Sequence, residues 1–385
     1  MVHDIFKMCK VSDDAKPCYK NEPGGLWRAM EIDLFVELAR PPGPDGVTPA
    51  VSDVYDDLIA IAKAADQLGI GAIWLPEHHF LGDYSASAAP DMLLAAIARE
   101  TTSVRLGFAI LPLPIHDPVR IAERLATLDV LSGGRVMWGV GRGVAKTELD
   151  GFGVDPSNTR EQFGVRLSEL RRYLSAGVLD RGGQRFSINP APSPRLREGW
   201  MAAVSPESFD LAAQLGLGVL TGPFKPWPMI NADLKRYRVA YPDGPTSFTM
   251  AAYCGPNHEQ SRRRAGPGIL WAYRRILDVT RTMMVQQVVG YEHYRKLGWV
   301  TPLLEGVLSL GVLENLGLAC VGDRDHVAKR LRALNNSGID RISLVLGGGD
   351  LGVSEAIKSL ELIMCDVMPK VLSADVSIAP VEVTG

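Results

Sequence analysis

The stretch LSGGRVMWGVGRG, residues 131–143, contains one complete unit of the pattern that decides the fold. Ser132-Gly133-Gly134 is typical of the end of a helix, because glycine readily adopts the left-handed conformation found there. Residues 136–140 form a short apolar run without alternation, as in a parallel strand that is covered on both faces. Glycines and one arginine follow directly, so this strand is predicted to end at a loop of nearly bare backbone.

The same unit of strand, loop and amphipathic helix recurs along the chain. Apolar runs predict eight strands, at residues 31–37, 72–75, 104–110, 136–140, 200–204, 218–220, 247–253 and 342–346. Asp117-Pro118 and Ser205-Pro206 predict helix starts, since each places an N-cap residue before a proline at the first helical position. Eight strands alternating with helices favour an α/β fold, a (β/α)8 TIM-like barrel, over an open doubly wound sheet. The Gly-rich fingerprint that such a sheet usually carries after its first strand is missing.

The pattern predicts one barrel domain over residues 29–375, with an N-terminal extension at 1–28 and a C-terminal tail at 376–385. Two stretches exceed the usual loop length, residues 141–199 after the fourth strand and residues 255–319 after the seventh. Active sites of such barrels lie at the carboxyl ends of the strands, so we expect these insertions to cover the site, with a lid over about residues 256–318. A helix that only packs on the barrel is an equal alternative for part of the second insertion.

Composition narrows the class of partner. The 385 residues carry a formal net charge of −3, too small to gather nucleic acid or an anionic membrane, so a small-molecule partner is expected. The five cysteines lack CxxC spacing, and no zinc ribbon is expected. The N-terminus lacks a secretory apolar core, and the longest clean apolar run, residues 92–98, is too short to span a bilayer. A cytoplasmic location is therefore predicted.

Two adjacent histidines, His78 and His79, directly follow the second predicted strand and are the candidate catalytic residues. Neighbouring side chains leaving a strand point to opposite sides, so we expect only one of them to face the barrel mouth. A histidine with an ordinary pKa can move protons near neutral pH. The sequence has no HxH on a strand and no HExxH motif, which disfavours a metal site.

A second set of residues at the same rim suits an anion. Gly139-Val140-Gly141-Arg142-Gly143 presents bare backbone and one guanidinium, but its GxGxG spacing fails the dinucleotide fingerprint. Ser205 and Ser208 lie at a predicted helix N-terminus after the neighbouring strand, a place where anions bind. The two motifs predict a phosphate cradle between strands four and five. The alternative cradle is Gly347-Gly348-Gly349 after strand eight.

Together with these motifs, residues 106–112 (LGFAILP), 116–123 (HDPVRIAE) and 131–135 (LSGGR) resemble the bacterial luciferase-like flavin monooxygenases, in both order and spacing. The resemblance covers about residues 31–220 and resumes over 320–346. It implies a TIM-like barrel that binds reduced FMN, delivered by a separate flavin reductase. It further implies that this flavin reacts with O2 to form a C4a-hydroperoxide, which oxidises a small organic substrate such as an aldehyde, a ketone or another apolar metabolite.

The resemblance also assigns residues. Arg142, the backbone of Val144, Ser205 and Ser208 match the family's phosphate contacts, and His78 matches the histidine beside the flavin ring, which leaves His79 to hydrogen-bond the surrounding loops. Ala109-Ile110 falls where luciferase has a non-prolyl cis peptide under the flavin, and Phe35 and Gly141 complete the expected cofactor-binding set. Gly141 replaces a cysteine of luciferase and Val204 an acidic residue, so luminescence is not implied.

Two other functions stay open at this point. One is hydride transfer with the deazaflavin F420 and without O2, since that chemistry uses the same fold. The other is a flavin-binding or partner subunit without catalysis, although the presence of both His78 and Arg142 weighs against it. The resemblance further implies a homodimer. The apolar residues within 92–98 and 121–131 could form its interface or pack on the barrel.

Overall fold

The computed structural model describes residues 30–43, 45–82, 84–285, 291–292 and 306–373. The predicted extension at 1–28 and the predicted tail at 376–385 lie outside the described residues. The same holds for part of the segment at 256–318.

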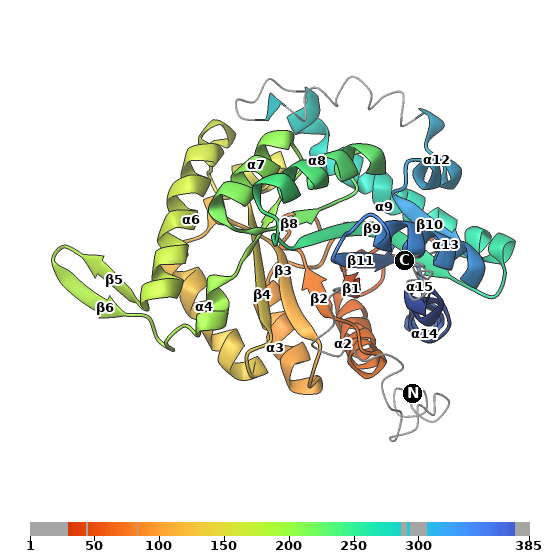
Figure 1. The fold of residues 1–385 in the computed structure, drawn as a ribbon, viewed down its shortest axis with the longest axis horizontal. Coiled ribbons are helices and arrows are strands. Elements are labelled where there is room, and N and C mark those ends of the chain that lie inside the picture. The colour runs from red at the N-terminus through yellow and green to blue at the C-terminus, as the bar shows by residue number, and fades with distance from the viewer. Residues whose placement is uncertain (1–29, 44, 83, 286–290, 293–305, 374–385) are drawn as a thin grey trace, which may run out of the picture.

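Eight parallel strands close into a barrel, which confirms the predicted fold class (Figure 1). The strands, in order around the barrel, are β1 (Glu31–Phe35), β2 (Ala72–Leu75), β3 (Arg105–Pro112), β4 (Val136–Gly141), β7 (Trp200–Ala202), β8 (Gly218–Thr221), β9 (Thr246–Cys254) and β11 (Arg341–Leu346). Parallel pairing of β8 with β9 and of β11 with β1 completes the ring. Each of these eight barrel strands overlaps one of the eight predicted runs.

Helices surround the strands, as Figure 1 shows. They are α2 (Val51–Leu68), α3 (Pro90–Glu100), α4 (Pro118–Ser132), α5 (Lys146–Gly151), α6 (Thr159–Ala176), α7 (Pro206–Leu215), α8 (Trp227–Ala240), α9 (His258–Val285), α12 (Leu310–Asn315), α13 (Arg324–Asn335), α14 (Val353–Glu361) and α15 (Met368–Leu372). The predicted caps hold, since Asp117 and Ser205 each accept backbone N–H groups of the helix they begin. Gly133 ends α4 with φ 69°, in the left-handed region.

Three short strands were not predicted. β10 (Ala319–Gly322) pairs with residues 251–254 of β9, beyond the point where β8 pairs with residues 246–248. β10 therefore takes the place of β8 beside the carboxyl end of β9. The antiparallel hairpin of β5 (Val178–Arg181) and β6 (Gln184–Ser187) projects from the barrel near α6 in Figure 1. Its mostly exposed side chains give no apolar run that could have revealed it.

The carboxyl ends of two strands lead into long connections. Between β4 and β7 the chain forms α5, α6, the β5–β6 hairpin and two short 3-10 helices, Pro156–Asn158 and Pro194–Arg197. Between β9 and β10 it forms α9 and α12. Within the described ranges, no helix is both long enough and apolar enough to span a membrane.

A buried ion pair ties the first strand to the last. Arg341 of β11 donates two hydrogen bonds to Asp33 of β1, at 2.7 and 2.6 Å, and the Trp74 indole donates a third to the same carboxylate at 2.8 Å. Gly107 on β3 leaves room for that indole, since a Cβ there would lie 2.2 Å from the Trp74 ring. Removing Arg341 would take the counter-ion from the buried Asp33 carboxylate, whereas Arg341 also pairs with Glu31 of β1 at 2.6 Å, so ion pairs hold β1 and β11 together.

Candidate active site

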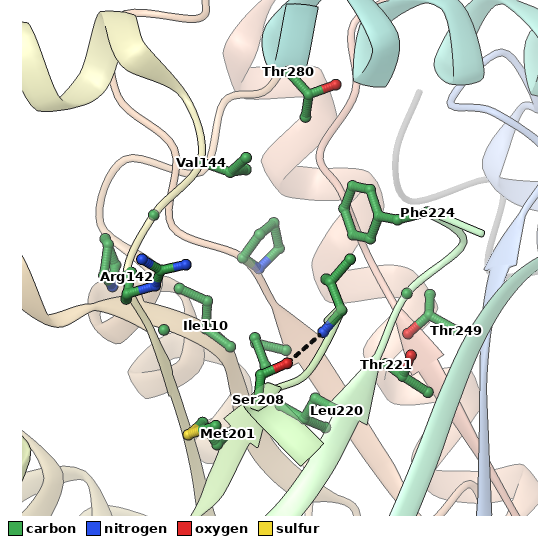
Figure 2. Close-up of a pocket in the computed structure, with 18 of the residues that line it drawn as sticks. Ile110, Arg142, Val144, Met201, Ser208, Leu220, Thr221, Phe224, Thr249 and Thr280 are labelled. Atoms are coloured by element: carbon green, nitrogen blue, oxygen red, sulfur yellow. Dashed lines mark hydrogen bonds between the residues drawn. The ribbon is translucent and has the colours of Figure 1, made fainter. Parts of the chain in front are cut away.

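A cavity of about 500 Å³ lies at the carboxyl ends of the barrel strands. That is where barrel enzymes place their sites, and the volume is in the range of small-molecule pockets. All eight residues predicted to bind the cofactor line it: Phe35, Ala109, Ile110, Gly141, Arg142, Val144, Ser205 and Ser208. In Figure 2, Arg142 and Phe224 lie on opposite sides of the cavity, with Val144 and Thr280 above and Met201 and Leu220 below. The fold thus brings together residues that are spread over most of the chain.

The first turn of α7 forms one end of the cavity. Ser205 caps the helix by accepting the N–H of Ser208 at 3.3 Å, and the Ser208 hydroxyl accepts the N–H of Val204 at 3.0 Å, the dashed line in Figure 2. The Ser208 hydroxyl also donates to the Ser205 carbonyl at 2.6 Å. Because β4 and β7 are neighbours, this helix start lies next to the loop that carries Arg142. A guanidinium and a helix N-terminus together suit a phosphate.

Tyr291 and Arg160 also line this end of the cavity, and the sequence did not reveal them. The Arg142 guanidinium lies over the Tyr291 ring, 4.5 Å from its centroid. The Tyr291 hydroxyl donates to the Gly143 carbonyl at 2.8 Å and accepts from Thr159 Oγ1 at 3.1 Å. Tyr291 therefore braces the backbone of the glycine loop and supports the arginine at the same time. No motif marks either residue, because both lie in the long connections rather than at strand ends.

Ala109, Ile110 and Gly141 form one part of the cavity wall. The Ala109–Ile110 peptide bond is cis, the conformation that the resemblance implies at this place. A Cβ built on Gly141 would lie 2.8 Å from Ile110 Cδ1 and 3.0 Å from Ile110 Cγ1. Ile110 thus occupies the space that a larger residue at 141 would need, which gives a physical reason for glycine where luciferase has cysteine.

His78 lines the cavity between two carboxylates. Its Nδ1 lies 2.8 Å from Glu148 Oε1, and its Nε2 lies 3.2 Å from Glu37 Oε1. Burial alone would lower the pKa of His78, but the hydrogen bonds and charges of Glu148 and Glu37 raise that pKa to about 10. The ring is therefore an imidazolium at neutral pH, and the expectation of an ordinary histidine pKa was wrong. Glu37 lies just after the first strand, so its position at the barrel rim could have been predicted from the sequence. Glu148 lies in no motif that marks it as a site residue.

His79 does not line the cavity, in contrast to its place among the candidate catalytic residues. Its Nε2 lies 2.8 Å from Glu77 Oε1, and its backbone N–H donates to Glu148 Oε1 at 2.9 Å. Its ring packs edge-on against Phe152, at 4.8 Å between centroids. His78 lines the cavity and His79 does not, in agreement with the expectation that only one of them faces the barrel mouth. His79 holds the loop that presents His78.

Glu77 joins His79 to a third histidine. Its Oε1 lies 2.8 Å from His79 Nε2 and 2.6 Å from His116 Nε2, so both rings donate to one buried oxygen. Burial alone would raise the pKa of Glu77, but the hydrogen bonds and charges of His116 and His79 lower that pKa to about 2. Glu77 is thus a carboxylate at any physiological pH. Its hydrogen bonds to His79 and His116 stabilise the loop that carries His78.

These two shifts predict opposite effects of pH on stability. The lowered pKa of Glu77 stabilises the fold fully above pH 4.5, and we expect this contribution to disappear as the pH falls towards 2. The raised pKa of His78 stabilises it fully below pH 6.5, and this contribution should disappear as the pH rises towards 10. Chemical denaturation across this pH range measures both limbs. Glu77→Gln should flatten only the acid limb and His78→Gln only the alkaline one, and an unchanged slope in either variant would contradict the assignment.

The alternative phosphate cradle, Gly347-Gly348-Gly349, does not line this cavity. A Cβ built on Gly348 would lie 1.9 Å from the carbonyl oxygen of Gly268 in α9, so the loop backbone packs directly on the helix backbone. The glycines here serve close packing of α9 on the barrel. The structure therefore favours the cradle at Arg142 and α7.

The closed barrel and the cavity at its carboxyl ends define the class of TIM-barrel enzymes. Residues 30–341 match the model of the luciferase-like monooxygenase family, and because this match spans most of the chain, the protein belongs to that family. Limonene 1,2-monooxygenase of Rhodococcus erythropolis is 26% identical over 332 residues, which cover 82% of this chain and 81% of that protein.

Two solved structures share the fold. The oxygenating constituent of 3,6-diketocamphane monooxygenase from Pseudomonas putida, a type II Baeyer-Villiger monooxygenase in complex with FMN, aligns with a TM-score of 0.71 at 18% identity, covering 89% of this chain and 98% of that one. An F420-dependent secondary alcohol dehydrogenase, in complex with an F420-acetone adduct, aligns with a TM-score of 0.63 at 18% identity, covering 89% and 99%. Both flavin and deazaflavin enzymes are therefore among the proteins that this fold resembles.

Proposed function

We propose that this protein is a monooxygenase that uses reduced FMN, supplied by a separate flavin reductase, and O2 to oxidise a small organic substrate. One observation carries the proposal: a single cavity joins an anion-binding end, at Arg142 and the α7 N-terminus, to a partly buried imidazolium at His78. The FMN complex of the diketocamphane enzyme, itself one constituent of a larger system, supports both the choice of flavin and the separate reductase.

The residues present fit FMN. Arg142 and the first turn of α7 suit the phosphate, and the small side chains of Ala109 and Gly141 leave a floor on which a flat ring can lie. When bound, reduced FMN would supply electrons for the cleavage of O2, so that one oxygen atom would enter the substrate and the other would leave as water. The chain itself contributes binding, orientation and protons.

His78 is the proton donor in this proposal. Its Nδ1 is held by Glu148, whereas its Nε2, 3.2 Å from Glu37, is the atom from which a proton can pass into the cavity. Glu148 and Glu37 act as positioning residues, because they fix the orientation of the ring and keep it charged. A cationic donor also stabilises negative charge that develops nearby.

Helix α9 covers part of the cavity and excludes water from it. Ile276, Val279 and Thr280 of α9 line the cavity, in agreement with the proposal that the segment at 256–318 acts as a lid. Water exclusion protects reactive intermediates from hydrolysis.

We expect Thr280→Trp to change the substrate range while FMN binding stays the same. The bulkier ring would enter the cavity from the α9 side, remote from Arg142. Relative kcat/KM values for a panel of aldehydes, ketones and cyclic apolar compounds, together with flavin titration, measure the two properties. Arg274→Trp, at an exposed position of the same helix, is the matched control. An unaltered substrate range in Thr280→Trp would show that α9 only packs on the barrel and does not select the substrate.

Three assays test the function itself. Incorporation of ¹⁸O from labelled O2 into product, with FMN and a flavin reductase present, is the expected result. Reduction of F420 by an alcohol in the absence of oxygen would instead favour the hydride-transfer alternative. Tight flavin binding without either reaction would leave a non-catalytic flavin-binding subunit.

The homodimer stays a prediction. Most apolar residues of the two stretches proposed for its interface are buried within the subunit: Leu94, Ile97 and Ala98 in α3, and Ile121, Ala122, Leu125, Ala126 and Leu128 in α4. Met92 of α3 and Val130 of α4 are exposed by 72% and 66%. Packing on the barrel thus accounts for most of this apolar surface, and sedimentation of the purified protein would decide the oligomeric state.

A further inference from the structure

A second cavity of about 140 Å³ adjoins the main one, and we refer to it as the side chamber. It lies among β1, β11, α2 and α9 and reaches the loop at Gly347-Gly348-Gly349. The two cavities share six lining residues: Phe35, Glu37, Tyr84, Pro223, Ile276 and Val345. The two cavities are therefore neighbours that share one wall.

The interior of the side chamber is apolar. Leu58 of α2, Ile269 of α9 and Leu344 of β11 are among its fully buried aliphatic walls. Among the described residues that line it, Glu37 and Asp57 are the charged ones, and the Tyr273 hydroxyl is already used by the Leu318 carbonyl at 2.9 Å. Burial, followed by the charges of Asp53 and Asp56, raises the pKa of Asp57 above its usual value. Such walls attract apolar groups.

The volume indicates the size of the group. An apolar protein cavity of about 150 Å³ stays dry and binds benzene or xenon, so the side chamber has room for a ring of about six carbons. A long flat ring system such as a flavin does not fit in this space, and it has the larger cavity available. The two cavities thus suit two different molecules, or two different parts of a complex.

Polar groups mark the junction between the two cavities. Glu37 lies 3.2 Å from His78 Nε2, and the Tyr84 ring lies 5.6 Å from the His78 ring. Burial, followed by the charge of Glu37, raises the pKa of Tyr84 well above its usual value, so its hydroxyl stays neutral and can donate. A polar group attached to a buried ring would meet these side chains on leaving the side chamber.

We propose that the side chamber binds the apolar ring, or a branched aliphatic group of the same size, of the substrate, and that the reacting carbon beside this group lies at the Glu37–Tyr84 junction. The identification of this ligand as substrate rests on the proposed function. The binding site itself does not, since it depends only on the shape and chemistry of the side chamber.

Benzene is the probe that tests the site. Calorimetric titration of the whole protein, with and without FMN, should show binding that Ala272→Phe weakens by roughly tenfold or more, because Ala272 lines the side chamber but not the main cavity. Ala240→Phe, at an exposed position of α8, is the control and should bind benzene like the wild type. Ala272→Leu serves the same purpose should the larger substitution impair folding. Equal affinity in wild type and a folded Ala272 variant, or displacement of benzene by FMN, would overturn the proposal.

Substrate kinetics separate this proposal from the proposed function. Ala272→Phe should lower kcat/KM for ring-bearing substrates more than for short linear ones, while flavin affinity remains unchanged. A protein that binds benzene in the side chamber but shows no flavin-dependent oxidation would refute the monooxygenase and leave the binding site in place. A flavin-dependent oxidation that Ala272→Phe affects equally for all substrates would refute the side chamber alone.

Discussion

His78→Ala is expected to reduce turnover by roughly 10²–10⁴-fold, the range for a positioned acid or base. The physical reason is the position of this imidazolium, which lines the cavity while Glu148 holds its Nδ1 at 2.8 Å. The rate of substrate-dependent O2 consumption in a protein saturated with reduced flavin measures the effect. Normal turnover in a folded His78→Ala variant would remove this residue from the mechanism.

The controls for this variant follow from the same geometry. His79→Ala should lower the melting temperature through its contacts with Glu77 and Phe152 and leave the chemistry largely intact, since His79 does not line the cavity. The pH–rate profile of the wild type should show no histidine limb near pH 6 to 7, because the pKa of His78 is about 10. Glu148→Gln should bring such a limb towards neutral pH, a change that a purely structural role of Glu148 would not produce.

Arg142→Ala is expected to weaken FMN binding by roughly tenfold to a hundredfold, because hydrogen bonds to charged groups contribute about 1.5–3 kcal/mol each. The guanidinium stands next to the α7 N-terminus, with the Tyr291 ring as its support. Flavin fluorescence titration measures the affinity. The matched control is Arg172→Ala, which also removes an arginine lying over a tyrosine, 5.1 Å from the Tyr173 ring, but does so away from the cavity.

An unchanged flavin affinity in Arg142→Ala would mean that the FMN phosphate binds at another place. The loop at Gly347-Gly348-Gly349 is then a poor second choice, since its backbone is packed against Gly268. Arg160, on the wall of the main cavity, would be the next residue to substitute. Tyr291→Leu should give a smaller loss than Arg142→Ala, because it removes the support of the guanidinium and keeps the charge.

The strands and the rim motifs could be predicted because each is encoded locally. A buried parallel strand requires a short apolar run, and a helix start requires a cap, so β4 and the Ser205 cap are visible in a few consecutive residues. The resemblance then supplied the residues that line the main cavity. β10 (Ala319–Gly322) was not predicted, because it lies at the end of the long connection that the pattern assigned to an insertion.

The partners of the predicted residues could not be predicted, since they depend on tertiary contacts. Glu148 follows His78 by 70 positions and sits on the short helix α5, and Tyr291 follows Arg142 at a still greater distance along the chain. The residue types indicated the candidates, but the protonation state of His78 depends on the carboxylates of Glu148 and Glu37 beside it. An imidazole between two carboxylates is a cation, whatever its usual pKa.

The backbone contact between Gly348 and Gly268 limits how this barrel can be recombined with its relatives. Helix α9 carries part of the cavity wall, which makes its exchange between family members an obvious way to create new specificities. At the contact, a Cβ on Gly348 would fall 1.9 Å from the Gly268 carbonyl oxygen, and neither backbone can move aside as a side chain would. A chimera that takes α9 from a relative must therefore also take the loop after β11 from that relative. The two segments have to be exchanged together, although about 80 residues separate them in the chain.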